Sequence, residues 1–157
     1  LVSLSGGIYS DCTITVTDTS SNSVTLNMSS FVIDTTAPTV SSISPTDNQS
    51  GVSISDNISV TFSEAMDNTS ITAITSGSSC SGTVRLSLDG FNNCLPMSLY
   101  SVSNTNKMFT FDPANNLEGG NTYKIIVTTG VKDGSGIPMA TNDISVSGNN
   151  GFTVPPK

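Results

Sequence analysis

Short segments that alternate apolar and hydroxyl-bearing residues constrain the fold more than any other feature. The segments "CTITVT", "ISVTF" and "MFTF" carry an apolar side chain at every second position. Side chains of a strand point to opposite faces in turn, so this alternation predicts one apolar and one polar face. Thr, Val, Ile and Ser dominate, whereas Leu, Glu, Lys and Ala are sparse, which disfavours helix. Charged residues make up only 11% of the chain, and the regular alternation indicates folded strands rather than disorder. We therefore predict an all-β protein.

Residues 37–157 contain about seven such segments, with turn signals every 8–12 residues, as in a two-sheet sandwich. The segment "SEAMD" (63–67) is predicted to form one helical turn, with Ser63 as N-cap and Met66 pointing inward. The predicted strands lie around Val40 and Ile43, around Val52 and Ile54, at 58–62, and in "TVRLSLD", "KMFTFDP", "TYKIIVTTG" and "DISVSGNNGFTV".

Residues 11–33 predict a hairpin that precedes this sandwich. Strands 11–18 and 23–33 flank the turn "DTSSN", and Cys12, Ile14 and Val16 alternate with threonines, giving one buried and one solvated face. Phe31 and Ile33 have the opposite parity to Met28, so a β-bulge is expected near residues 29–30. A hairpin alone is marginally stable in water, so this one needs more sheet from elsewhere.

The net charge of −7 disfavours binding to nucleic acid and to anionic membrane surfaces. The chain has no apolar run of 18 residues, so no membrane insertion is expected. It begins at Leu1 within a strand pattern and without a signal peptide, and we expect it to be part of something longer.

Three cysteines occur in a chain that lacks histidine and any Cys-x-x-Cys spacing, which disfavours zinc. Cys80 and Cys94 flank a strand followed by the turn Asp89-Gly90, and a disulfide between them would stabilise the fold by roughly 3 kcal/mol. The alternative is two unpaired buried thiols. A disulfide implies an oxidising compartment and hence secretion. Cys12 is then left without a partner here, and we expect it to pair with a cysteine outside residues 1–157 or outside this chain.

The segments "PTVSSISPTDNQSGVSISDNISVTFSEAMD" and "FTFDPANNLEGGNTYKIIVTTGVKDGSGIPM" carry a family resemblance. Residues 37 to 155 resemble a bacterial immunoglobulin-like domain of the type found in S-layer and other surface proteins. The closing part of the family pattern matches Tyr123, Ile125, Val127, Val131, Asp133 and Gly136. The resemblance implies an immunoglobulin-like β-sandwich in residues 36–157. Residues 1–35 resemble the closing strands of a preceding or neighbouring related repeat.

The segment "DTTAP" is predicted to be the joint between the two repeats. Proline restricts itself and its predecessor to extended conformations, so a short and semi-rigid joint is expected. The joint comprises Asp34, Thr35, Thr36, Ala37 and Pro38.

Carboxylates near the joint are the first candidate site. Asp34 and Asp133 could supply oxygen ligands to calcium, although a turn in which the aspartate bonds its own backbone is the favoured interpretation. Glu64 and Asp67 could mimic a pair of catalytic carboxylates, but no nucleophile accompanies them. No cofactor other than calcium is expected.

The loop "DGFNNCLPM" is the second candidate, where Phe91, Leu95 and Pro96 could bind a glycan or a protein. The chain has no coherent triad, phosphate loop or cofactor fingerprint, so we expect no enzymatic activity.

Three functions follow from the sequence. The first is a structural, non-catalytic tandem repeat of a secreted bacterial surface protein, forming an extracellular stalk, adhesin shaft or head-to-tail filament with copies of itself or adjacent repeats. The second is a module that binds a glycan or a host or cell-surface protein. The third is an accessory domain of a secreted hydrolase.

Overall fold

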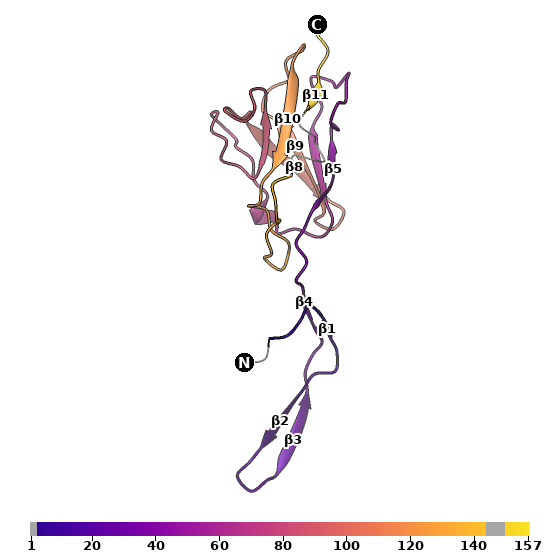
Figure 1. Ribbon diagram of the computed structural model, residues 1–157, viewed down its shortest axis with the longest axis vertical. Coiled ribbons are helices and arrows are strands. Elements are labelled where there is room, and N and C mark those ends of the chain that lie inside the picture. Colours follow the sequence, from indigo (N-terminus) through magenta and orange to yellow (C-terminus); the bar gives the residue numbers. More distant parts are fainter. Residues whose placement is uncertain (1–2, 144–149) are drawn as a thin grey trace. The chain divides into compact units, whose positions relative to one another are not determined.

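The computed structural model describes residues 3–143 and 150–157, in two compact units, Leu1–Thr36 and Ala37–Lys157 (Figure 1). Among the described residues there is no α-helix, and none of their helical turns is long and apolar enough to cross a membrane.

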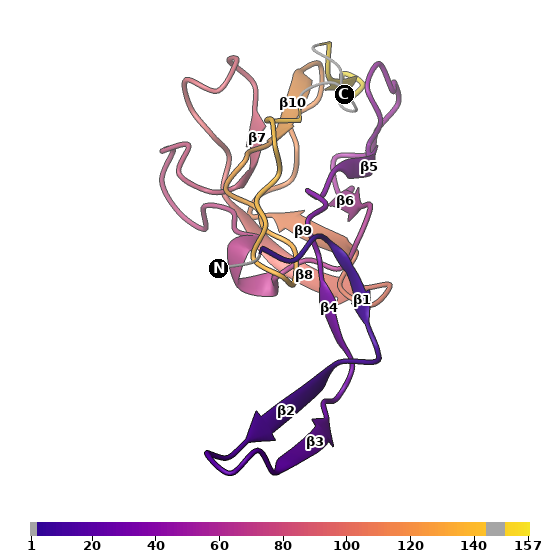
Figure 2. The ribbon, with the colours of Figure 1, turned by 60° about the horizontal axis from the view of Figure 1, so that its bottom comes forward.

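The second unit is a sandwich of two antiparallel sheets, which pack face to face (Figure 2). The all-β, immunoglobulin-like fold predicted from the sequence is confirmed. The four-stranded sheet has the order β5 (Val40–Ser44), β6 (Ile58–Phe62), β9 (Met108–Pro113) and β8 (Met97–Ser103), and the three-stranded sheet has the order β11 (Phe152–Thr153), β10 (Thr122–Val127) and β7 (Val84–Ser87).

Alternate side chains of both sheets form one core. Phe62 and Phe109 meet edge to face, with ring centroids 5.9 Å apart, and Tyr123 stacks on Phe152 at 5.5 Å. Full burial of each such side chain stabilises the fold by about 1.5–3 kcal/mol. Val40 and Ile43 are three residues apart, yet both are buried, because a register shift between Val40 and Ser42 turns both inward.

The hydroxyl of Tyr123, at the start of β10, accepts a hydrogen bond from the backbone N–H of Glu118 at 2.6 Å. Tyr123 is buried, so the bond satisfies its one polar atom inside the core. A tyrosine bonded to backbone a few residues upstream recurs at this corner of immunoglobulin-like sandwiches.

The segment 63–67 differs from its prediction, because it is not a helical turn capped by Ser63. The backbone of Met66 forms a β-bridge with Asp133, which holds the chain extended. The helical turn, η1 (Asn68–Ser70), follows instead, and its N-cap is Asp67, whose side chain accepts from the N–H of Thr69. Met66 is buried, as predicted.

Other strand boundaries also differ. Strand β8 was not predicted, because only Met97 and Val102 among its residues turn away from solvent and the alternation is weak. The predicted strand around Val52 and Ile54 is a loop, although Val52 is buried. Strand β7 ends before Leu88, which is exposed. Predicted strand residues Ile144 and Val146 lie outside the described residues.

The first unit contains two separate antiparallel pairs. Strands β2 (Thr13–Thr17) and β3 (Ser23–Asn27) form a hairpin, and β1 (Gly7–Tyr9) pairs with β4 (Phe31–Ile33) (Figure 2). The single strand predicted for 23–33 with a bulge is therefore wrong: the chain leaves one partner after Asn27 and joins another at Phe31. The missed strand β1 supplies Tyr9, whose ring stacks on Phe31 at 5.2 Å.

Candidate functional site

The β2–β3 hairpin carries an exposed apolar face. Cross-strand pairing places Ile14 opposite Leu26 and Val16 opposite Val24, so the four side chains share one face of the hairpin. They are 49–57% exposed, whereas the inward residues of the second unit are almost fully buried. The solvated face was predicted, but the expected burial of the other face does not occur within the first unit. We call these four residues the hairpin face.

The opposite side of the hairpin is polar and satisfied. The hydroxyls of Thr15 and Thr25 lie 2.9 Å apart, and those of Thr17 and Ser23 lie 2.7 Å apart. The Asp18 carboxylate accepts from the backbone N–H groups of Ser20 and Asn22 and closes the turn. Hydrogen bonds from Asn22 lower the pKa of Asp18, and the bond from the Asn22 side chain contributes more than the bond from its backbone. The polar side of the hairpin therefore has its hydrogen bonds satisfied, and only the apolar side lacks a covering partner within this unit.

Cys12 lies at the entrance to the hairpin, half-buried and with a free thiol. Its backbone carbonyl accepts from the N–H of Met28 at 2.9 Å, so the pairing of the hairpin extends to this residue. The disulfide between Cys80 and Cys94 is present, with Cα atoms 5.0 Å apart, and it encloses β7. The pairing of Cys12 with a cysteine elsewhere stays a prediction.

The predicted joint spans the boundary between the units. In the first unit, Asp34 accepts a hydrogen bond from the N–H of Thr36 at 2.9 Å. In the second unit, Thr39 and Ser63 exchange two hydrogen bonds of 2.9 and 3.0 Å, which fix the residue after Pro38 at the end of the sandwich. The semi-rigidity of the joint stays a prediction.

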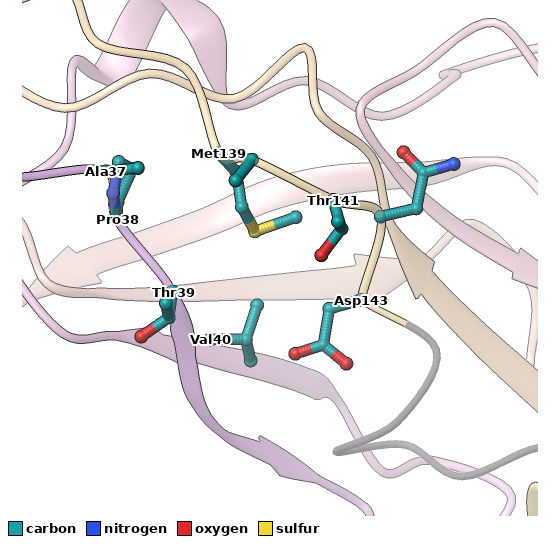
Figure 3. Close-up of a pocket in the computed structure, with 9 residues that line it drawn as sticks. Ala37, Pro38, Thr39, Val40, Met139, Thr141 and Asp143 are labelled. Atoms are coloured by element: carbon teal, nitrogen blue, oxygen red, sulfur yellow. The ribbon is translucent and has the colours of Figure 1, made fainter.

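A cavity of about 250 Å³ adjoins the second unit's part of this joint. Figure 3 shows Met139, Thr141 and Asp143 extending toward the segment that carries Thr39 and Val40. Met139 and Val40 are buried, whereas Thr39 and Thr141 are exposed, so the lining of the cavity is partly apolar and partly polar.

The predicted ligand loop is only partly assembled into a cavity. Leu95 and Pro96 line a space of about 150 Å³ together with Leu117 and Tyr123, whereas Phe91 is not among its lining residues. Phe91 has a φ of 70°, and its N–H donates to the hydroxyl of Ser87, which holds it in the preceding turn. The cavity is smaller than the roughly 300–1,000 Å³ typical of ligand pockets.

Hydrogen bonds also hold the Asp89 carboxylate in this turn. It accepts from the backbone N–H of Asn93 at 2.9 Å and from the side-chain amide of the same residue at 2.8 Å. These bonds lower the pKa of Asp89, and the bond from the Asn93 backbone contributes most. Its chemistry is that of a turn-forming carboxylate.

Glu64 and Asp67, the predicted carboxylate pair, have separate roles. Asp67 is the N-cap of η1. Hydrogen bonds from Thr69 lower the pKa of Asp67, and the bond from the Thr69 side chain contributes more than the bond from its backbone. Glu64 instead has a carboxylate oxygen within 4.8 Å of one of Asp133. Sequence reasoning missed this pair, because no local pattern relates two loops 69 positions apart.

Asp133, one of the two predicted calcium ligands, is buried in the loop after β10. Its Oδ1 atom accepts from the N–H groups of Ser135 and Ile137, both at 2.8 Å, in the manner of a turn-forming aspartate. Its Oδ2 atom is buried without a hydrogen-bond partner. Asp34, the other predicted ligand, lies in the first unit, and its role stays a prediction.

Comparisons with known proteins agree with this architecture. The chain is similar to a crystal structure of the N-terminal part of the bacterial S-layer protein SbsC, with 23% identity and a TM-score of 0.50, over 76% of this chain and 24% of that chain. It is also similar to a structure of domains 1–6 of the surface layer protein SbsC, with 24% identity and a TM-score of 0.51, over 77% and 14% respectively. At these identities, the likeness concerns the fold alone. The chain spans about a quarter or less of the length of these structures.

Comparison with curated protein sequences gives no significant match. A family model described as a bacterial Ig-like domain matches residues 34–147, which is most of the chain. The two-sheet topology and the Tyr123 corner are those expected of such a domain. The chain therefore belongs to the family of bacterial Ig-like domains.

Proposed function

We propose that the chain is a non-catalytic structural repeat of a secreted bacterial surface protein, and that its hairpin face is covered by strands of a neighbouring Ig-like sandwich. Family membership and the likeness to S-layer proteins support a structural role at the cell surface. Such repeats, joined head to tail at a constant angle, form a stalk or an open filament.

The observation that carries the proposal is the exposure of Ile14, Val16, Val24 and Leu26 on one side of a regular hairpin. A two-stranded sheet with a bare apolar face is marginal in water and invites pairing. The second unit already has two sheets of its own around a closed core. A sandwich partner of the same fold fits the face because inward side chains of two sheets interdigitate.

Two sources could supply the covering strands: an adjacent repeat of one longer polypeptide, or a second subunit. Strand addition between chains satisfies the edges of such a hairpin in the same way as an adjacent repeat does. The free thiol of Cys12 lies beside the hairpin face, so we propose a disulfide to a cysteine outside this chain as a covalent link at the same junction.

The test compares two neighbouring substitutions in β3. Leu26→Lys places a charge in the hairpin face, whereas Thr25→Lys places the same charge on the polar side. In sedimentation velocity, we expect the wild-type chain and Thr25→Lys to self-associate as their concentration rises to about 100 μM, and Leu26→Lys to remain monomeric.

A wild-type chain that is monomeric at all these concentrations, and that Leu26→Lys destabilises more than Thr25→Lys, would contradict the proposal. That result would mean that the hairpin face is covered within the chain itself. The same samples, run without reductant, should show cross-linked dimers that a Cys12→Ser variant lacks.

Recognition of a glycan or protein at the Leu95–Pro96 cavity is the second candidate. Its support is that two of the three predicted loop residues line one cavity. The small volume and the position of Phe91 outside it place this function behind the structural one. A glycan array with wild-type protein and a Leu95→Ala variant tests it.

A further inference from the structure

Two loops at one end of the second unit are joined by their backbones. The N–H of Gly134 donates to the carbonyl of Ala65 at 3.0 Å, and the N–H of Asp67 donates to the carbonyl of Lys132 at 2.9 Å. The bridge between Met66 and Asp133 lies between these bonds. The loop after β6 and the loop after β10 therefore hold fixed positions relative to each other.

This pairing brings a buried oxygen toward a second carboxylate. Asp133 is 1% exposed, and its Oδ2 atom has no hydrogen-bond partner, although Oδ1 has two. A buried polar atom without a partner is unfavourable, and more so for a carboxylate. The half-buried Glu64 places a carboxylate oxygen within 4.8 Å of an Asp133 oxygen. Two carboxylates that approach this closely call for a positive charge between them.

The separation suits a shared calcium ion. Calcium binds oxygen ligands at 2.3–2.6 Å, so two oxygens on one ion lie at most about 4.6–5.2 Å apart. Lys107 is a competing source of positive charge, because its ammonium donates to the carbonyl of Ser63 at 3.1 Å and has two further N–H donors. A lysine, however, would not make the stability of the chain depend on calcium. The ligands are all oxygen, and the described residues contain no histidine, which disfavours zinc and other transition metals.

We propose that Oδ2 of Asp133 and the carboxylate of Glu64 bind a calcium ion, with water at the remaining positions. The ion satisfies the orphaned oxygen and ties the loop after β6 to the loop after β10. Because both loops lie in the second unit, the proposal is independent of the hairpin face and of the proposed function.

The experiment measures thermal unfolding of the full chain, freed of metal with a chelator and then titrated with calcium chloride. Extracellular modules bind calcium with dissociation constants of about 10⁻⁴–10⁻³ M, so we expect a saturable rise in melting temperature of several degrees by about 10 mM. Magnesium at the same concentration should have little effect, because it requires a stricter octahedral geometry.

Three variants separate a site from general screening of the acidic surface. Glu64→Gln removes the negative charge of one ligand at a half-buried position, and Asp133→Asn keeps the Oδ1 acceptor of the turn while replacing Oδ2. Asp112→Asn makes the same charge change at an exposed position of β9.

We expect the calcium-dependent rise to be lost in Glu64→Gln and Asp133→Asn and kept in Asp112→Asn. If Asp133→Asn does not fold, Glu64→Gln alone decides the question. No rise in the wild-type chain, or an equal rise in Glu64→Gln and Asp112→Asn, would overturn the proposal, and a water molecule would then explain the orphaned oxygen.

Discussion

Removing the Cys80–Cys94 disulfide tests how the loop around β7 is stabilised. The two cysteines are separated by 14 positions, and Cys94 is buried while Cys80 is half-buried. In the chain-entropy model, closing a loop of this length lowers the entropy of the unfolded state and stabilises the fold by about 3 kcal/mol. For a unit of this size, that loss corresponds to a fall in melting temperature of roughly 10–15 °C.

Backbone hydrogen bonds hold this region in addition to the disulfide. The N–H of Cys94 donates to the carbonyl of Ser78 at 2.9 Å, and that of Leu95 donates to the carbonyl of Leu86 at 2.8 Å. A Cys80→Ala/Cys94→Ala variant should therefore keep the same fold and lose stability mainly through its unfolded state. We expect unchanged circular dichroism and a lower midpoint of guanidinium unfolding.

A Cys12→Ser variant, which leaves the disulfide intact, is the matched control. Its midpoint should equal that of the wild-type chain under conditions where both are monomeric. A loss of less than about 1 kcal/mol in the double variant would refute the entropic account, because the predicted effect is three times larger.

Three further changes act on the core and on the turns. Leu86→Ala, at a fully buried position, should lower the free energy of unfolding by about 2–5 kcal/mol, measured by denaturant titration. Tyr123→Phe should cost about 1 kcal/mol in the same assay, because its hydroxyl accepts a backbone hydrogen bond; an unchanged value would contradict the role of this corner. The pKa values of Asp18, Asp67 and Asp89 are lower in the folded state than the value near 3.8 in the unfolded state, so these carboxylates stabilise the fold at any pH above 3.8. This stabilisation is lost as the pH falls from 3.8 through the folded pKa values. Carboxyl chemical shifts followed by NMR should give midpoints below 3.8 for all three, and midpoints at or above that value would contradict the hydrogen-bonded turns.

The fold could be predicted because its strongest strands alternate cleanly. In β6 and β10, every second residue is buried, and the inward set is apolar throughout. Strand β8 escaped prediction because it lies at the edge of its sheet, where most of its side chains contact water and carry no periodic signal. Register shifts, such as that after Val40, also break the period of two.

The candidate site was less accessible to sequence reasoning. Asp133 could be selected because an aspartate in a Gly-rich turn can either bond its own backbone or bind a metal ion. In the structure, its Oδ1 atom bonds the backbone of the turn, whereas its Oδ2 atom has no hydrogen-bond partner. Glu64 was paired with Asp67 instead, because its local context resembled a helical turn, and the bridge between Met66 and Asp133 that brings the two loops together is a long-range contact. Long-range pairing overrides local propensity at such positions.

The exposed hairpin face follows from the alternation, but what covers it does not. The pattern of Ile14, Val16, Val24 and Leu26 specifies an apolar side and contains no information about its occupant. The occupant is therefore the central claim of this account.

An electron cryo-microscopy structure of the native surface material tests that claim most directly. We predict that Ile14, Val16, Val24 and Leu26 are buried in a sandwich that contains strands from a neighbouring repeat or subunit, and not from residues 37–157 of the same chain. Native material in which this face contacts residues 37–157 of its own chain, in an isolated monomer, would contradict the account and favour a stand-alone binding domain.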